Sequence, residues 1–225
     1  MLHQAPLIAH TSEVSVQVPS SDFESDYQLI RESVADILGI SADDVEGVRR
    51  ISGGDVCISL RVYAGGRYLF AKLPPTGDDQ MLDAEVAGLR WIAEGLGEAV
   101  PEVLGHTQRL MIMEWVKPGE ATRDAAVEAG KRIATLHSME VDAFGVAPPG
   151  APEVGRIGPL PLEYGSYSDW SQFYAQERMF PYMEIAKERG ALTWEEFDTL
   201  TTLAARLYRY AGPEVTPVRT HGDLW

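Results

Sequence analysis

Three strand-like runs joined by glycine turns limit what this chain can fold into more than any other feature. The runs are rich in β-branched and aromatic residues, and a pair of glycines separates each run from the next. Such pairs are typical of hairpin turns, because glycine reaches the positive φ values that tight turns require. The pattern predicts an antiparallel meander. The runs and glycine pairs are Val45–Ile51, Gly53-Gly54, Val56–Tyr63, Gly65-Gly66 and Tyr68–Leu73.

Helical and strand patterns on both sides of the meander extend this prediction. Apolar residues recur at three- and four-residue steps from residue 21 to Gly39, and again in a helix that contains Leu82 and Val86. Two further strand-like runs follow at Glu102–His106 and Arg109–Met113. We therefore expect an α+β, protein-kinase-like two-lobed fold, with a five-stranded antiparallel sheet plus a helix in the N-lobe.

The rest of the chain is expected to form a mainly helical and incomplete C-lobe. A Thr-x-x-Glu capping box opens its last helix. The expected segments are a helix from Thr122, an irregular loop at 142–166, a helix at 168–186 kinked by Pro181, and a helix from Thr193 to Tyr210. The resulting divisions are a tail or edge strand at 1–20, a nucleotide-binding N-lobe at 21–113, a hinge at 114–119 and a partial C-lobe at 120–225.

Composition and charge exclude several classes of protein. The chain of 225 residues has a net charge of −15, and its 34 acidic side chains would repel the phosphate backbone of a nucleic acid. No apolar run approaches the ~18 residues that can span a bilayer, and the N-terminus lacks a signal-peptide pattern. The single cysteine, Cys57, excludes an internal disulfide. We therefore expect a cytoplasmic protein without nucleic-acid or membrane partners.

The first glycine turn is a candidate phosphate-binding loop. Gly53 and Gly54 lack Cβ atoms, so the backbone amides of this turn, with Asp55 beside them, can approach nucleotide phosphates closely. The turn matches neither the Walker A motif nor the protein-kinase glycine motif. By itself, such a turn is more often an ordinary hairpin connection.

Lys72 and Glu85 are a candidate phosphate-binding pair. Lys72 ends the third strand among apolar neighbours, and Glu85 follows thirteen residues later in a helical pattern. In kinase-like folds, a lysine on the third strand contacts the nucleotide phosphates, and a glutamate on the next helix holds it. Each residue alone is usually exposed to solvent, but an ammonium group in an apolar strand needs a partner. We therefore predict that the two side chains form an ion pair.

Two further segments complete the expected nucleotide site. The last N-lobe strand leads into Glu114, Trp115 and Val116 before a Pro-Gly pair, which is where backbone groups of a hinge would hydrogen-bond an adenine. A plain strand end is an equally good interpretation of this segment alone. At the end of the chain, Asp223 follows His-Gly after an extended segment, and such a carboxylate can accept the proton of an acceptor hydroxyl.

Several of these segments, taken in order, resemble one family. His-Gly-Asp-Leu-Trp at 221–225 is similar to the start of the HGDLW-x-x-N loop of fructosamine kinases, which are relatives of the aminoglycoside phosphotransferases. The turn at 53–55 resembles the family's Gly-Gly-Asp-Ile-Asn segment, with Cys57 at the asparagine position, and the segment at 83–89 resembles its E-A-x-G-L helix. The helix after Ser168 resembles the one that separates fructosamine kinases from aminoglycoside kinases. The resemblance covers nearly the whole chain.

The resemblance implies an ATP-dependent kinase that acts on a small molecule. Lys72 would order the phosphates of ATP, and Asp223 would position the 3-hydroxyl of a ketosamine, a sugar joined to an amine by glycation. Phosphorylation makes that adduct labile, so the family acts in protein deglycation. The family's Mg²⁺ ligands would lie beyond Trp225, so no metal ligand is assigned here. A chain that ends at this residue is expected to be truncated and weakly active or inactive.

Two alternatives stay open. One is a related small-molecule kinase that acts on aminoglycosides, choline or homoserine. The other is a non-catalytic fragment or pseudokinase that binds nucleotide at most. The residues identify neither the glycated amine nor the oligomeric state.

Overall fold

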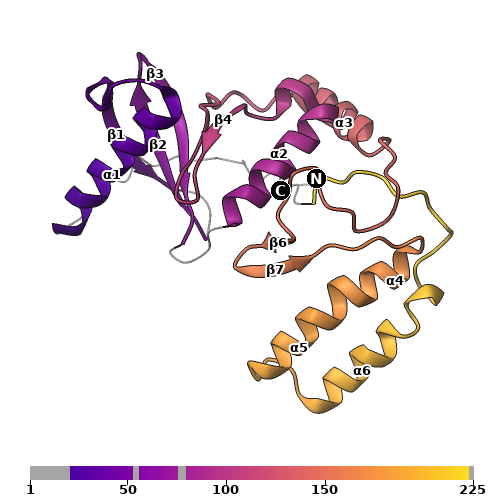
Figure 1. Ribbon diagram of the computed structural model, residues 1–225. Coiled ribbons are helices and arrows are strands. Elements are labelled where there is room, and N and C mark those ends of the chain that lie inside the picture. Colours follow the sequence, from indigo (N-terminus) through magenta and orange to yellow (C-terminus); the bar gives the residue numbers. More distant parts are fainter. Residues whose placement is uncertain (1–20, 53–55, 76–79, 223–225) are drawn as a thin grey trace, which may run out of the picture.

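The structure, a computed structural model, describes residues 21–52, 56–75 and 80–222. Its main element is a five-stranded antiparallel sheet in the order β1-β2-β3-β5-β4 (Figure 1). The expected sheet is therefore confirmed, and Gly65 and Gly66 have the positive φ values, 55° and 78°, that its second tight turn requires. The strands are β1 (Val45–Ile51), β2 (Ile58–Ala64), β3 (Arg67–Leu73), β4 (Val103–His106) and β5 (Met111–Glu114).

Helices α1 (Ser21–Leu38) and α2 (Met81–Leu96) pack on opposite faces of the sheet. Neighbouring residues of β5 show the division, because side chains alternate between the two faces of a strand. Ile112 belongs to the apolar cluster under α1, whereas Met111 belongs to the cluster under α2. Both side chains are completely buried, and burial of each contributes on the order of 1.5–3 kcal/mol to folding.

Helix α3 (Arg123–Leu136) packs against the end of α2 and leads the chain away from the sheet. Its expected start is confirmed, because the Thr122 side chain accepts a hydrogen bond from the Ala125 amide and so caps the helix. The two helices approach closely at Gly95 of α2. A Cβ atom there would lie 2.7 Å from the sulfur of Met139 and 3.1 Å from the Cα of Leu136.

The segment predicted to be an irregular loop, residues 142–166, contains a β-hairpin. Strands β6 (Val154–Ile157) and β7 (Leu160–Glu163) pair antiparallel, and Gly158 with φ of 56° lies in the turn between them. The prediction was wrong here because prolines and glycines hid two very short strands. The hairpin is held from outside, since β6 contacts α2 and β7 contacts the helical turn at Ala175–Met179.

The helix predicted at 168–186 has a different irregularity from the expected kink. It consists of α4 (Trp170–Tyr174), a π-helical turn (Ala175–Met179) and α5 (Phe180–Glu188), and Pro181 lies in the first turn of α5. Proline cannot donate to the carbonyl four residues earlier, which belongs to Glu177. Nη1 of Arg178 supplies that hydrogen bond at 2.8 Å. The backbone therefore accommodates Pro181 through a π turn, and α4 and α5 continue in one direction (Figure 1).

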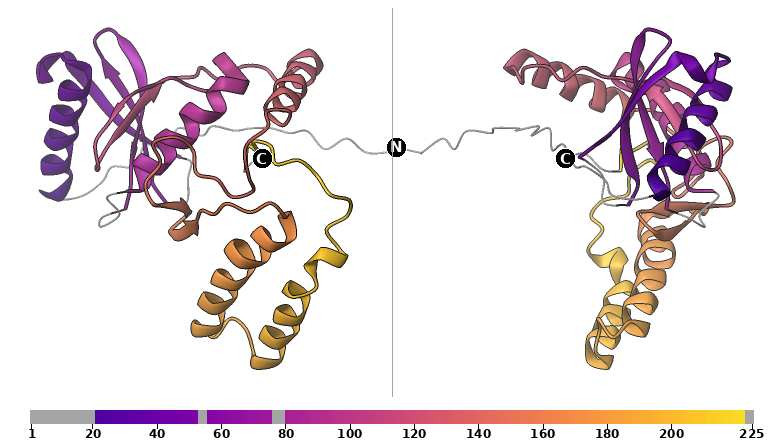
Figure 2. Two further views of the ribbon diagram at one scale, coloured as in Figure 1. Left: turned by 45° about the vertical axis from the view of Figure 1, so that its right-hand side comes forward. Right: turned by 90° about the vertical axis from the view of Figure 1, so that its left-hand side faces the viewer.

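Helix α6 (Trp194–Ala204) runs back beside α5, so that the two form a helical hairpin projecting away from the sheet (Figure 2). The capping box is confirmed, because Thr193 and Glu196 exchange both of its hydrogen bonds. The prediction that this helix reaches Tyr210 was wrong. Tyr208 and Tyr210 remain exposed, so packing does not support the α-helical pitch, and the backbone tightens into the 3₁₀ turn Leu207–Arg209. No helix in the described ranges is long and apolar enough to cross a membrane.

Candidate functional site

Lys72 and Glu85 form the ion pair that their spacing predicted. Nζ of Lys72 donates to both carboxylate oxygens of Glu85, and each distance is 2.7 Å. Lys72 lies near the end of β3 and Glu85 in the second turn of α2, so the pair joins the sheet to the helix. The side chains are 24% and 29% exposed, so the pair is only partly buried. Lysine has three N–H donors, so one remains for a phosphate oxygen once Glu85 has taken two.

A second contact between α2 and the sheet lies beside this pair. Nε2 of His106, on β4, is 2.8 Å from a carboxylate oxygen of Asp83. Asp83 and Glu85 are two positions apart on α2, so they leave the helix about 200° apart around its axis. The two acidic side chains therefore reach the sheet on both flanks of the buried Leu82 and Val86. Sequence analysis missed the contact, because nothing in the local pattern distinguishes Asp83 from an exposed helix residue.

The predicted hinge residues follow directly from β5. The amide of Glu114 donates to the carbonyl of Glu102 at 2.9 Å, so this amide is already engaged in joining two segments of the lobe. Trp115 lies under the guanidinium of Arg61, 5.8 Å from the ring centroid, and the Val116 side chain is exposed. The Glu114 amide is therefore not available for an adenine contact, and the predicted contact would fall to its carbonyl or to the backbone of Trp115 and Val116. Their assignment to nucleotide binding stays a prediction.

The structure describes the segment before the His-Gly-Asp tripeptide, but not the carboxylate predicted to be catalytic. Residues 217–219 run beside the chain that follows α3, where Val141 donates to the Pro217 carbonyl at 3.0 Å and Arg219 donates to the Met139 carbonyl at 2.9 Å. The predicted base Asp223 and the predicted phosphate-loop residues Gly53, Gly54 and Asp55 lie outside the described residues. Their roles stay predictions. The extended segment predicted before the His-Gly-Asp tripeptide is confirmed, because Val218 forms an antiparallel bridge with Glu140.

The side chain of Arg219 makes contacts that sequence analysis did not foresee. Its Nη1 lies 2.6 Å from a carboxylate oxygen of Glu94 and 3.0 Å from the carbonyl of Trp91, both on α2. The helix that carries Glu85 is thus also in contact with the segment that leads to the His-Gly-Asp tripeptide. The sequence could not identify the partner of Arg219, because the contact joins residues more than a hundred positions apart.

Arg178 is the centre of a second polar cluster that the sequence did not reveal. Its Nη1 donates to the Glu163 carbonyl of β7 at 2.7 Å, and its guanidinium stacks 4.7 Å from the centroid of Phe173. Burial lowers the pKa of Arg178 and raises the pKa of both Tyr164 and Tyr182. The arginine therefore fixes the β6–β7 hairpin on the π turn, and this role is structural.

A cleft of about 500 Å³ lies between the start of α4 and the segment after α6. Its walls include Asp169, Trp170, Tyr208 and Glu214. Hydrogen bonds from the Ser171 hydroxyl and the Gln172 amide lower the pKa of Asp169, which caps α4. Lys72, Glu85 and the hinge residues do not line this cleft, so it is separate from the candidate nucleotide site.

The described residues include a group that can contact ATP, but no cluster that can hold Mg²⁺. The Lys72 ammonium, with a free donor at the end of β3, fits a nucleotide phosphate. In contrast, no three His, Cys, Asp or Glu side chains lie close enough together in the described ranges to hold a metal ion. Cys57 is buried, with its sulfur 3.7 Å from that of Met81.

Known proteins match this chain over most of its sequence. The sequence profile described as Fructosamine kinase matches residues 27–225. The chain is 28% identical over 189 residues to the Probable ketoamine kinase of Lactiplantibacillus plantarum, a match that covers 81% of this chain and 63% of that protein. The chain thus spans about three fifths of the length of this relative.

Solved structures agree with the profile. The crystal structure of a candidate fructosamine-3-kinase from Thermobifida fusca is 32% identical, with a TM-score of 0.75 over 87% of this chain and 67% of that chain. The gentamicin complex of APH(2″)-IIa is 14% identical, with a TM-score of 0.51 over 89% of this chain and 61% of that chain, and this similarity shows the fold alone. With the profile matched over most of its length, the chain belongs to the fructosamine kinase family.

Proposed function

We propose that the complete protein transfers the γ-phosphoryl group of ATP to the 3-hydroxyl of a ketosamine. The observation that carries this proposal is the bidentate contact of Lys72 with Glu85, 2.7 Å to each oxygen, within a fold of the fructosamine kinase family. An ammonium held in this way is oriented before the nucleotide arrives. Orientation of this kind is what phosphoryl transfer requires, because the reaction depends on positioning and electrostatic stabilisation rather than on covalent chemistry by the protein.

Each predicted residue has one role in this proposal. Lys72 contacts the α- and β-phosphates of ATP, and Glu85 keeps its ammonium in place. The hinge backbone at Glu114, Trp115 and Val116 contacts the adenine. Asp223 accepts the proton of the acceptor hydroxyl as the oxygen attacks the γ-phosphorus. Gly53, Gly54 and Asp55 cover the phosphates. The proposed division is an N-lobe at 21–113, a hinge at 114–119 and the beginning of a C-lobe at 120–225.

The acceptor is tested with a panel of substrates. The complete protein is incubated with ATP and Mg²⁺ and with a fructosyl-amine, a ribulosyl-amine or kanamycin, and ADP release is followed in a coupled assay. We expect turnover with one or both ketosamines, loss of that turnover in Asp223→Asn, and a product whose phosphate is on the 3-oxygen by ³¹P NMR. Faster turnover of kanamycin would move the protein to the aminoglycoside kinases.

The same assay addresses the non-catalytic alternative. A pseudokinase would bind an ATP analogue in calorimetry, yet it would release no ADP with any acceptor. The Lys72–Glu85 ion pair does not distinguish a kinase from a pseudokinase, because nucleotide binding alone uses the same pair. Turnover is therefore the deciding measurement.

A further inference from the structure

The contact of Arg219 with helix α2 joins two parts of the proposed site that are far apart in the chain. Nη1 of Arg219 donates to the Glu94 carboxylate at 2.6 Å and to the Trp91 carbonyl at 3.0 Å. The guanidinium also lies 4.9 Å from the centroid of the Trp91 ring. The Arg219 side chain is only 15% exposed, whereas Glu94 is 55% exposed, so the arginine is held in a partly buried position and its carboxylate partner faces solvent. A hydrogen bond from a charged donor is stronger than a neutral one.

Both ends of this connection bear on the proposed chemistry. Glu94 is nine residues after Glu85 on one uninterrupted helix, so the two ion pairs on α2 are about 14 Å apart along its axis. One pair holds Lys72, and the other holds Arg219, which is four residues before Asp223. The Arg219 amide is also fixed by the Met139 carbonyl. The segment is thus held by its backbone on one side and by its side chain on the other.

We propose that Arg219 is a positioning residue: by binding α2, it fixes the start of the catalytic loop relative to Lys72. This inference rests on the proposed function, because it assigns Arg219 to the site in which Lys72 holds phosphates and Asp223 acts as the base. An α-helix is stiff over four turns, so a loop tied to one end of α2 keeps its distance from a lysine tied to the other.

Arginine is suited to this position for chemical reasons. Its planar guanidinium can donate to a carboxylate and a carbonyl while its face rests on an indole ring, whereas the lysine ammonium is a point charge without such a face. Nε of Arg219 is buried and meets no hydrogen-bond acceptor among the described residues. The hydrogen bonds of Nη1 and the contact with the Trp91 ring must therefore offset the free-energy cost of an unsatisfied donor. A side chain that bears such a cost is held in place by the structure around it.

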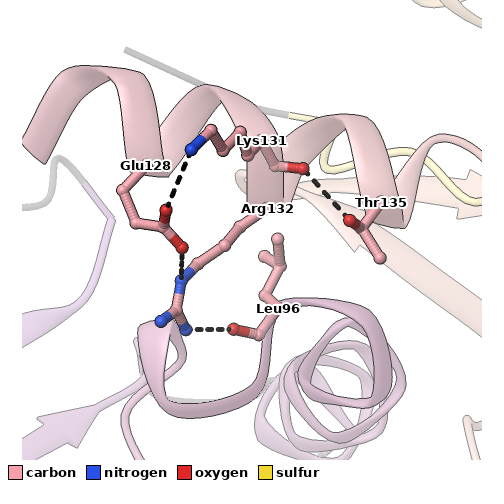
Figure 3. A network of polar contacts seen from close by, with 5 residues as sticks. All are labelled: Leu96, Glu128, Lys131, Arg132 and Thr135. Carbon is pink, nitrogen blue, oxygen red and sulfur yellow. Dashed lines mark hydrogen bonds and ion pairs between the residues drawn. The ribbon is translucent and has the colours of Figure 1, made fainter. Parts of the chain in front are cut away.

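Arg132 provides a matched control on the same end of α2. Figure 3 shows its guanidinium between Glu128 and the carbonyl of Leu96, and the distances are 3.3 and 3.1 Å. Arg132 therefore anchors α2 to α3 by the same chemistry, a guanidinium shared between a carboxylate and a helix carbonyl. It belongs to α3 and does not lead to the His-Gly-Asp tripeptide. Its loss should affect stability without moving the catalytic loop.

The test compares Arg219→Ala, Glu94→Gln and Arg132→Ala in the complete protein. We expect Arg219→Ala to lower kcat for a ketosamine roughly 10- to 100-fold, because small displacements of a reacting group are costly. The Kd for a non-hydrolysable ATP analogue should change by no more than about two-fold, since Lys72 and Glu85 remain in place. Glu94→Gln should lower kcat less, and the double variant should be no slower than Arg219→Ala. Arg132→Ala should lower Tm and leave kcat unchanged.

Equal kcat values for Arg219→Ala and Arg132→Ala would overturn the inference, as would a rise in the Kd of the ATP analogue that accounts for the whole loss. If Arg219→Ala does not fold, Glu94→Gln decides the question by the same criteria. If the unaltered protein turns over no acceptor, the proposed function fails, and hydrogen exchange decides the inference separately. Faster amide exchange in residues 218–222 of Arg219→Ala than of Arg132→Ala then supports it, and equal exchange overturns it.

Discussion

Lys72 and His106 lie in one row across the sheet, each opposite Met111 of the strand between them. Residues directly opposite one another on neighbouring strands point to the same face, so all three side chains face α2. Each of the two basic side chains pairs with a carboxylate near the start of that helix, Lys72 with Glu85 and His106 with Asp83. The position of Glu85 is therefore defined by two contacts with the sheet rather than by one.

Apolar packing between these contacts makes the arrangement rigid. Leu82 and Val86 are four positions apart, so they form one stripe of α2, and both are buried against Met111. The two ion pairs lie on either flank of that stripe. A rotation of α2 about its axis would lengthen one ion pair and withdraw an apolar side chain at the same time.

Removal of the Lys72 ammonium should abolish most of the activity while leaving the fold intact. In Lys72→Ala we expect kcat/KM for ATP to fall at least about 100-fold, which is typical of the loss of one group that contacts transferring phosphates. Steady-state kinetics gives the rate, and circular dichroism reports the fold. Lys131→Ala, a change of an exposed lysine on α3, is the matched control. An unaltered rate in Lys72→Ala would remove this residue from the proposed site.

The contact between His106 and Asp83 should act through Glu85. Asp83→Asn weakens the attachment of the first turn of α2, so we expect kcat/KM to fall roughly 3- to 10-fold, with a smaller fall when Glu85→Gln is already present. A double-mutant cycle measures this coupling, which should be about 0.5–3 kcal/mol for groups in one network. Fully additive effects of Asp83→Asn and Glu85→Gln would mean that the two contacts are independent.

Two glycines of α2 should respond to alanine in opposite ways. A Cβ atom at Gly95 would lie 3.1 Å from the Leu136 backbone, so Gly95→Ala forces α2 and α3 apart and should cost about 1–3 kcal/mol. At Gly88 nothing lies within 4 Å, and Gly88→Ala should stabilise the helix by up to about 1 kcal/mol. Thermal unfolding of both variants checks the prediction. A lower Tm in Gly88→Ala would show that this face of α2 is covered in the complete protein.

The capping box of α6 should make the stability of that helix depend on pH. Hydrogen bonds from the Thr193 amide and hydroxyl lower the pKa of Glu196 below its ordinary value. The unfolded chain therefore binds a proton more readily than the folded one. The contribution of the capping box to stability is therefore present above the pKa of Glu196 in the unfolded chain. It is lost as the pH falls through the lower pKa of Glu196 in the folded chain. We expect Glu196→Ala to lower Tm near pH 7 but to have little effect once the carboxyl group is protonated.

Glu195→Ala is the control for this measurement, because Glu195 occupies the same helical turn but does not belong to the capping box. Scans of Tm against pH for both variants give the comparison. A difference between the unaltered chain and Glu196→Ala that persists unchanged at low pH would exclude the carboxylate as its source.

Local sequence patterns were sufficient wherever the structure depends on neighbouring residues. Glycine pairs separate the strands of the meander, and apolar residues at helical spacing mark α1 and α2. Thr193 with Glu196 marks the start of α6, because both hydrogen bonds of a capping box lie within four residues. The Lys72–Glu85 pair was also predictable, because an ammonium group among apolar strand neighbours needs a partner and kinase-like folds supply a glutamate from the next helix.

Only the tertiary structure decided the features in which distant segments meet. The β6–β7 hairpin is supported by α2 and by the π turn, so its short strands have no clear pattern of their own. In the π turn, Arg178 donates to the Glu177 carbonyl, which Pro181 has no N–H to reach. Arg219 and Glu94 are 125 residues apart, and neither residue type identifies the other along the chain. Periodicity and capping act over a few residues, whereas such contacts exist only after folding has brought the helix and the loop together.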